Sequence, residues 1–154
     1  MKKIIRYIIF YIFFCSLQFI LWQYTNVYNI SPNFILIAIV YIGIIKGKMP
    51  GQLTGFLFGL FWDTFSLIDT FGLRILIFTV IGYFSSELSK NFNGNKIFTQ
   101  LTIIFFLNIF YSLYFYFICY NTNKTLYFLI QKSIEIFTTM LICPLFFYIL
   151  KFYI

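Results

Sequence analysis

Long apolar runs, separated by short polar segments, dominate the chain. A transmembrane helix needs about 20 predominantly apolar residues, and most of these runs come near that length. The pattern therefore predicts an all-α protein with about six transmembrane helices in one bundle. Their expected limits are residues 4–22, 33–45, 51–67, 73–88, 97–120 and 126–150.

The second run is short. Its roughly 13 residues would reach only about 20 Å, less than the ~30 Å hydrocarbon core. It either crosses with local thinning and help from its neighbours, or forms a re-entrant segment; the charges favour crossing. Pro32 and Pro50 stand where the second and third helices should begin, positions at which the missing N–H costs nothing. Pro144, inside the last run, removes a backbone donor and should kink that helix.

Composition agrees with a membrane protein. Of the 154 residues, 62% are hydrophobic and 10% are charged, against roughly 25% charged residues in soluble domains. A soluble domain of this size buries only about 70% of the surface of its chain, so the remaining apolar surface requires a bilayer. We expect one integral membrane domain, residues 1–154. The basic, apolar N-terminus resembles a signal peptide but lacks a cleavage site, which predicts a retained first helix.

The cations are distributed unevenly between the two ends of the predicted helices. With a cytoplasmic N-terminus and six crossings, the cytoplasmic side carries Lys2, Lys3, Arg6, Lys46, Lys48, Lys90, Lys96 and Lys151. The outer side carries Arg74, Lys124 and Lys132. This bias follows the positive-inside rule and reverses if the second helix does not cross, so both termini are predicted to be cytoplasmic. The net charge of +7 does not indicate nucleic acid, because the cations form no patch.

Few residues are suited to catalysis or metal binding. Histidine is absent, and the three cysteines lie singly inside apolar runs, as buried free thiols do. An intramembrane aspartyl protease would need two facing aspartates, whereas Asp63 and Asp69 share one short stretch. Lys132 and Glu135 lie three residues apart and can neutralise each other on one helix face. We therefore expect a non-catalytic protein without a metal or other cofactor.

Residues 50–74 differ from the rest of the chain because they combine small residues, a charge and a turn. Gly51, Gly55 and Gly59 recur every four residues, so they share one helix face, and Asp63 continues the same step. Rows of small residues let membrane helices approach closely. Two interpretations are open: the glycine face packs within the chain's own bundle, or it docks a helix of another protein.

Asp63 is expected in the outer half of the membrane, where a charge is costly and should face protein. Arg74 begins the next helix after a short turn, so an Asp63–Arg74 pair across this hairpin is the favoured interpretation. Asp69 is an alternative partner for Arg74, and Asp69 or Thr70 could cap the following helix. A proton or ion relay, or a charge that faces a partner protein, are the other interpretations of Asp63.

In this region the chain resembles the MreD family, small integral membrane proteins of the bacterial cell-elongation machinery. The likeness lies in residues 31–84. Its elements are Pro32, Tyr41, the glycine row, Gly59 four residues before Asp63, Gly72-Leu73-Arg74 and Gly82-Tyr83. Pro144, a late proline in the last helix, also matches the family.

The resemblance implies a multi-pass protein of the bacterial inner membrane that maintains rod shape. Such proteins bind MreC and, with it, connect MreB filaments to the RodA and penicillin-binding-protein pair that builds lateral peptidoglycan. No catalytic residue is known for the family. Asp63 and Arg74 would then be architectural, and the glycine face or the outer aromatic surface would meet an MreC-like partner.

A transporter component is the alternative. The MreD bundle is similar in architecture to the substrate-binding S components of vitamin transporters, which need a pocket with several convergent polar groups. S components commonly carry an alanine pair in helix one that docks the energising module, whereas Ala38 is the only alanine in this chain. A generic membrane scaffold unrelated to the cell wall is a third interpretation.

Overall fold

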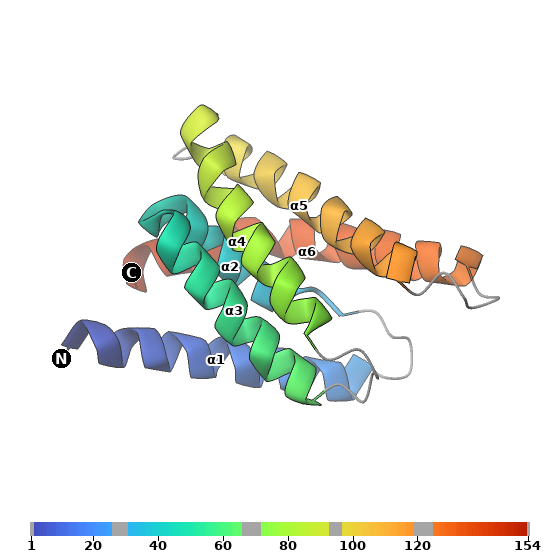
Figure 1. Cartoon of the computed structure of the whole chain (residues 1–154), viewed down its shortest axis with the longest axis horizontal. Coiled ribbons are helices and arrows are strands. Elements are labelled where there is room, and N and C mark those ends of the chain that lie inside the picture. Colours follow the sequence, from blue (N-terminus) through green and yellow to red (C-terminus); the bar gives the residue numbers. More distant parts are fainter. Residues whose placement is uncertain (1, 26–30, 66–71, 93–96, 119–124, 154) are drawn as a thin grey trace.

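The computed structural model describes residues 2–25, 31–65, 72–92, 97–118 and 125–153, and the structural statements below concern these residues. They form six α-helices and no strand, which confirms the all-α prediction. The helices are α1 (Lys2–Thr25), α2 (Phe34–Lys46), α3 (Lys48–Phe65), α4 (Leu73–Asn91), α5 (Ile97–Ile118) and α6 (Thr125–Tyr153). Successive helices alternate in direction, so the start of α1 and the end of α6 lie on the same side of the molecule (Figure 1).

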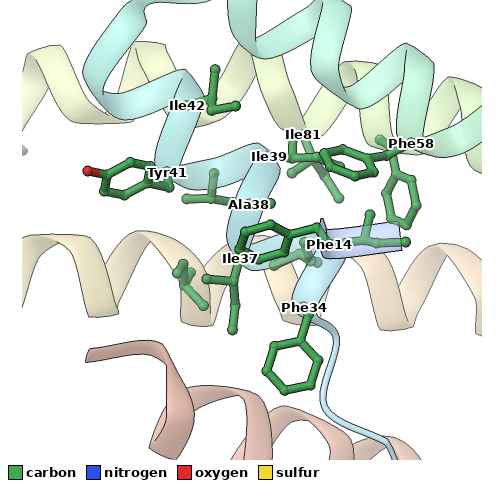
Figure 2. Close-up of a cluster of buried hydrophobic side chains, with 14 of the residues drawn as sticks. Phe14, Phe34, Ile37, Ala38, Ile39, Tyr41, Ile42, Phe58 and Ile81 are labelled. Carbon is green, nitrogen blue, oxygen red and sulfur yellow. The ribbon is translucent and has the colours of Figure 1, made fainter. Parts of the chain in front are cut away.

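The short helix α2 is the centre of the molecule. Its 13 residues carry no charge before Lys46, the pattern of a helix that is surrounded by protein. All residues from Phe34 to Gly43 are buried, and the other five helices all contact α2. Figure 2 shows side chains of neighbouring helices converging on it. Because protein surrounds α2, the helix can be shorter than the hydrocarbon core without exposing its backbone to lipid.

Helix α3 begins earlier than the sequence pattern predicts. The expected start is Gly51, whereas the structure starts the helix at Lys48. Gly47 makes the turn from α2 with a φ of 97°, a conformation that glycine adopts without steric cost. Pro50 is thus the third helical residue, where its missing N–H leaves no helical bond unmade. The Gly51 amide donates to the Gly47 carbonyl at 3.1 Å, so the regular ladder starts directly after Pro50.

Of the other two prolines, one lies outside a helix and the other lies inside one. Pro32 lies outside α2, because Asn33 caps the helix and Phe34 is its first residue. The capping side chain of Asn33, and not Pro32, therefore marks the start of α2. Pro144 lies inside α6, which is assigned as one continuous helix through it. The kink expected at Pro144 stays a prediction.

Apolar side chains also cover the outside of the bundle. Exposed large apolar residues occur on every helix; they include Ile12, Ile45, Leu57, Leu76, Phe106 and Leu141. Soluble monomers rarely expose apolar surface so extensively, so this exterior fits a lipid environment. Among the described residues, two segments are long and apolar enough by themselves to span a membrane, Ile97–Phe117 in α5 and Leu129–Lys151 in α6. The apolar parts of α1 and α2 are shorter, so the predicted six crossings go beyond what length and composition establish.

One end of the α3–α4 hairpin carries an ion pair. Lys48, the first residue of α3, pairs with Glu87 near the end of α4, and its ammonium lies 4.8 Å from the centroid of the Tyr83 ring. The hydrogen bond with Lys48 lowers the pKa of Glu87, and the same bond raises the pKa of Lys48. The two side chains are 35% and 40% exposed, so solvent screens the pair and its main effect is to orient the helix ends.

Candidate functional site

The glycine row of α3 lies against α4, and the two backbones touch. A Cβ atom added to Gly51 would lie 2.5 Å from the Gly82 carbonyl oxygen, and one added to Gly55 would lie 2.2 Å from a carbonyl oxygen of α4. A Cβ at Gly59 would lie 2.5 Å from the Ile75 Cα. Real Cβ atoms essentially never make contacts shorter than 3.0 Å, so these positions leave no room for a side chain. In this structure the glycine face is occupied by α4 of the same chain.

Asp63 is buried and faces the first turn of α4. Its Oδ2 accepts hydrogen bonds from the Gly72 amide at 2.9 Å and from the Ile75 amide at 3.3 Å. Amides at a helix N-terminus have no partner within the helix, and the positive end of the helix dipole favours a carboxylate there. Gly72 makes the turn with a φ of 100°, which a residue with a Cβ adopts only with strain. Asp63 of α3 thus caps α4.

The expected ion pair between Asp63 and Arg74 is not found. Among the described residues, the ion pairs are those that Lys48 and Lys132 form with glutamates. Backbone amides at the start of α4 instead supply donors to the Asp63 carboxylate, and hydrogen bonds of this kind stabilise its charged form. The alternative partner and caps proposed at residues 69 and 70 lie outside the described part of the chain.

Arg74 is held between aromatic rings. The guanidinium carbon lies 5.8 Å from the centroid of the Trp62 ring and 5.6 Å from that of the Phe115 ring, within range of cation–π attraction. Its Nη1 donates to the Trp62 carbonyl at 3.5 Å, a long and therefore weak bond. Its Nε is buried and makes no hydrogen bond to the described residues.

Three polar side chains accept hydrogen bonds from backbone amides at the buried start of α2. The Asn33 Oδ1 accepts from the Leu36 amide at 3.0 Å, and the Gln18 Oε1 of α1 accepts from the Phe34 amide at 2.9 Å. The Thr139 hydroxyl of α6 accepts from the Asn33 amide at 3.1 Å. All three side chains are buried. Unpaired backbone groups are costly in a membrane, so these bonds allow α2 to begin inside the protein.

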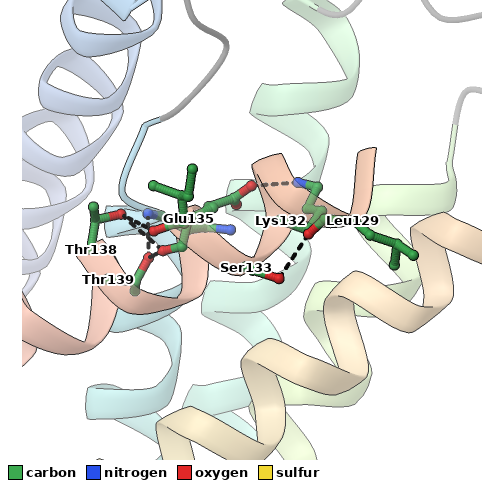
Figure 3. Close-up of polar contacts among 8 residues, drawn as sticks. Leu129, Lys132, Ser133, Glu135, Thr138 and Thr139 are labelled. Atoms are coloured by element: carbon green, nitrogen blue, oxygen red, sulfur yellow. Dashed lines mark hydrogen bonds and ion pairs between the residues drawn. The ribbon is translucent and has the colours of Figure 1, made fainter. Parts of the chain in front are cut away.

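Lys132 and Glu135 of α6 form the ion pair that their spacing predicts. The Nζ and Oε2 atoms are 2.5 Å apart, and the side chains are only 21% and 13% exposed. The Glu135 carbonyl also accepts from the Thr139 hydroxyl at 2.6 Å; Figure 3 shows these groups together on α6. The Lys132 ammonium lies 5.5 Å from the centroid of the Tyr111 ring of α5. Through Thr139, the pair is connected to the start of α2.

A cavity of about 160 Å³ lies where these groups meet. It exceeds the ~10–15 Å³ that a single water needs. Its polar lining includes Gln18, Asn33, Arg74, Tyr111, Lys132 and Glu135, which come from α1, the start of α2, α4, α5 and α6. Among the described residues, no group of three or more His, Cys, Asp or Glu side chains is placed to hold a metal ion. The arrangement is suited to binding a small polar group.

The hairpin residues and the Lys132–Glu135 pair were predicted from the sequence, whereas the other residues that line the cavity were not. Gln18, Asn33 and Tyr111 are polar residues within or beside apolar runs, and their partners lie far along the chain. One signal was available: an amide such as Gln18 inside an apolar helix needs a partner in another helix. An amide at this position therefore predicts a polar contact but does not say which residue is its partner.

An all-helical bundle with an apolar exterior and buried polar contacts is typical of helical membrane proteins. The family model for the rod shape-determining protein MreD matches residues 1–154, the whole chain. The chain therefore belongs to the MreD family, which confirms the resemblance seen in the sequence. MreD proteins are membrane proteins that determine rod shape, and theirs is not a known enzyme family. No curated protein and no solved structure matches the chain.

Proposed function

We propose that this protein is a non-catalytic component of the bacterial cell-elongation complex and binds an MreC-like partner in the membrane. Membership of the MreD family is the observation that carries this proposal. Through MreC, the protein connects MreB filaments to the RodA and penicillin-binding-protein pair, and so acts on peptidoglycan synthesis. The buried carboxylates agree with an architectural role: Asp63 caps a helix and Glu135 pairs with Lys132.

We also propose six crossings of the inner membrane with both termini in the cytoplasm. The alternating helix directions and the shared side of the chain ends support this topology (Figure 1). The lysines at the α2–α3 turn and at the end of α4 support it through the positive-inside rule. Reporter fusions after Lys48 and after Lys96 should both give cytoplasmic signals. An external signal at either position contradicts the topology.

The partner's binding surface is proposed to be an outer apolar face, because α4 covers the glycine row. On α3 the exposed residues Leu53, Phe56, Leu57 and Leu60 follow the spacing of one helix face. This stripe is available to a transmembrane helix of a partner. A photo-crosslinking amino acid at Leu57 should capture an MreC-like protein, whereas the same group at Leu141, an exposed position on α6, serves as the control. Capture only at Leu141 would move the proposed surface to α6.

Co-purification tests the proposal as a whole. The tagged protein, extracted from host membranes in a mild detergent, should retain an MreC-like protein, and a chain carrying a scrambled α3 outer face should lose it. Genes for MreB, MreC or RodA homologues beside its gene would add support. Absence of an MreC-like protein both from this preparation and from cross-linked membranes would contradict the proposal.

A membrane component of a vitamin-type transporter is the alternative function. The polar cavity favours it, since such components need convergent polar groups. Ala38, the only alanine in the chain, is buried within α2, so no alanine pair is available on α1 to dock an energising module. Loss of vitamin uptake with normal cell shape after depletion would establish this alternative.

A further inference from the structure

The charged side chains that line the polar cavity carry a net positive charge. Its charged lining residues among those described are Arg74, Lys132 and Glu135, which leaves one positive charge in excess. The Glu135 carboxylate is already bound to Lys132. A cavity between largely buried side chains that has an excess cation attracts an anion, because the protein interior screens charge much less than water does.

The two amide side chains of the lining add hydrogen-bond donors to this positive charge. The Gln18 oxygen accepts from the Phe34 amide and the Asn33 oxygen accepts from the Leu36 amide. Each of these oxygens already accepts a bond from α2, and the NH2 groups are the donors that Gln18 and Asn33 can offer a ligand. The cavity also adjoins the N-terminus of α2, whose dipole favours negative charge.

Arg74 is held in position for such a ligand. The Trp62 and Phe115 rings lie within cation–π range of its guanidinium, and its hydrogen bond to the Trp62 carbonyl is long, at 3.5 Å. Its buried Nε lacks an acceptor among the described residues. A planar guanidinium with donors to spare is the side chain that best recognises carboxylate and phosphate groups.

We propose that this cavity binds a small anionic group, a carboxylate or a phosphate, with Arg74 as its main contact and Lys132 as the second. The group belongs either to a soluble metabolite or to the headgroup of an anionic lipid. This inference goes beyond the proposed role in cell elongation and does not depend on it. Binding to the purified chain tests it without any partner, so its failure would leave the elongation proposal standing.

The experiment uses the full chain in phosphatidylcholine nanodiscs. Sodium phosphate and sodium acetate are titrated by calorimetry, with sodium chloride at equal ionic strength as the reference, and headgroup binding is measured by native mass spectrometry after reconstitution with phosphatidylglycerol. Saturable binding of phosphate or acetate supports a soluble source. Retained phosphatidylglycerol without such binding supports the headgroup source. No saturable response to phosphate, acetate or phosphatidylglycerol overturns the proposal.

The charge variants should change the affinity for the anion in opposite directions, which a general loss of folding cannot do. Lys132→Gln and Arg74→Gln should each weaken binding about 10- to 100-fold, the value of one hydrogen bond to a charged group. Glu135→Gln releases Lys132 and should strengthen binding. The matched controls are Lys48→Gln and Glu87→Gln, because that pair also combines a lysine, a glutamate and a tyrosine ring but lies at the other end of α3. Equal effects in the control variants, or weaker anion binding in Glu135→Gln, overturn the proposal.

Discussion

Replacing Gly55 by alanine tests whether the glycine row holds the hairpin together. The new Cβ would lie 2.2 Å from the Phe78 carbonyl oxygen, 2.6 Å from the Phe78 carbonyl carbon and 2.9 Å from the Thr79 amide nitrogen. All three atoms belong to the backbone of α4, so no side-chain rotation can relieve the clash. To restore an ordinary contact, the two helices must separate locally by more than about 1 Å.

Two opposing effects set the size of the change. Alanine favours the helical state by about 1 kcal/mol over glycine, whereas forcing an extra carbon into a packed interface costs typically ~1–3 kcal/mol and occasionally more. Because the obstruction at Gly55 is backbone, the interface cost should lie in the upper part of that range, about 2–3 kcal/mol, which leaves a net destabilisation of about 1–2 kcal/mol. The sign is informative, because without the α4 contact the same substitution would stabilise the helix.

The assay follows the buried thiols. Cys15 and Cys143 are buried, so in a Cys119→Ser background a maleimide dye reports unfolding of the purified protein on heating. Gly55→Ala should lower the midpoint, and Leu53→Ala, at an exposed position of the same helix, should change it little. An unchanged or raised midpoint for Gly55→Ala would refute packing against α4. If that variant also lost its MreC-like partner, the glycine face would instead be a docking surface.

Three further predictions concern polar contacts. Asp63→Asn keeps an acceptor but loses the charge at the α4 N-terminus, so it should destabilise the protein by about 1 kcal/mol. Asp63→Leu should cost about 1–3 kcal/mol for each amide left unpaired. Equal unfolding midpoints for the two variants would argue against capping. Gln18→Leu removes the acceptor for the first amide of α2 and should cost about 1–3 kcal/mol in thermal unfolding, whereas the exposed Gln23→Leu should have little effect; similar losses would contradict the assigned bond. Lys48 lowers the pKa of Glu87 in the folded protein. The Lys48–Glu87 pair therefore contributes to stability at neutral pH. This contribution is lost as the pH falls below about 4.3, the pKa of an unperturbed glutamate, and through the lowered pKa. Midpoints measured from pH 7 downward should therefore show a smaller acid decrease in Glu87→Gln than in the wild type.

The fold was largely predictable, because helix number and type follow from apolar runs and the turns between them. The glycine period and Asp63 also indicated a close hairpin, since a charge or a row of glycines inside an apolar run needs a protein neighbour. The partner predicted for Asp63 was wrong, however. Sequence spacing favoured Arg74, but backbone amides compete for a carboxylate as effectively as a cation does, and a sequence does not display them.

The central position of α2 and the polar cavity were not predicted from the sequence. The short run of α2 was interpreted as a problem of membrane thickness, although its lack of a polar face is typical of a helix enclosed by protein. The cavity joins Gln18, Asn33, Arg74, Tyr111 and Lys132 across five parts of the chain. Their convergence depends on how the helices pack, and periodicity within one helix contains no information about that.

Depletion of the protein in its bacterial host tests the central claim most directly. Cells are grown with the gene under a repressible promoter, and the ratio of cell length to width is measured as the protein is diluted by growth. The proposed role in elongation predicts that this ratio falls and that cells become round or swollen, with recovery when the wild-type chain is expressed again. Cells that keep their shape but lose uptake of a small vitamin would contradict it.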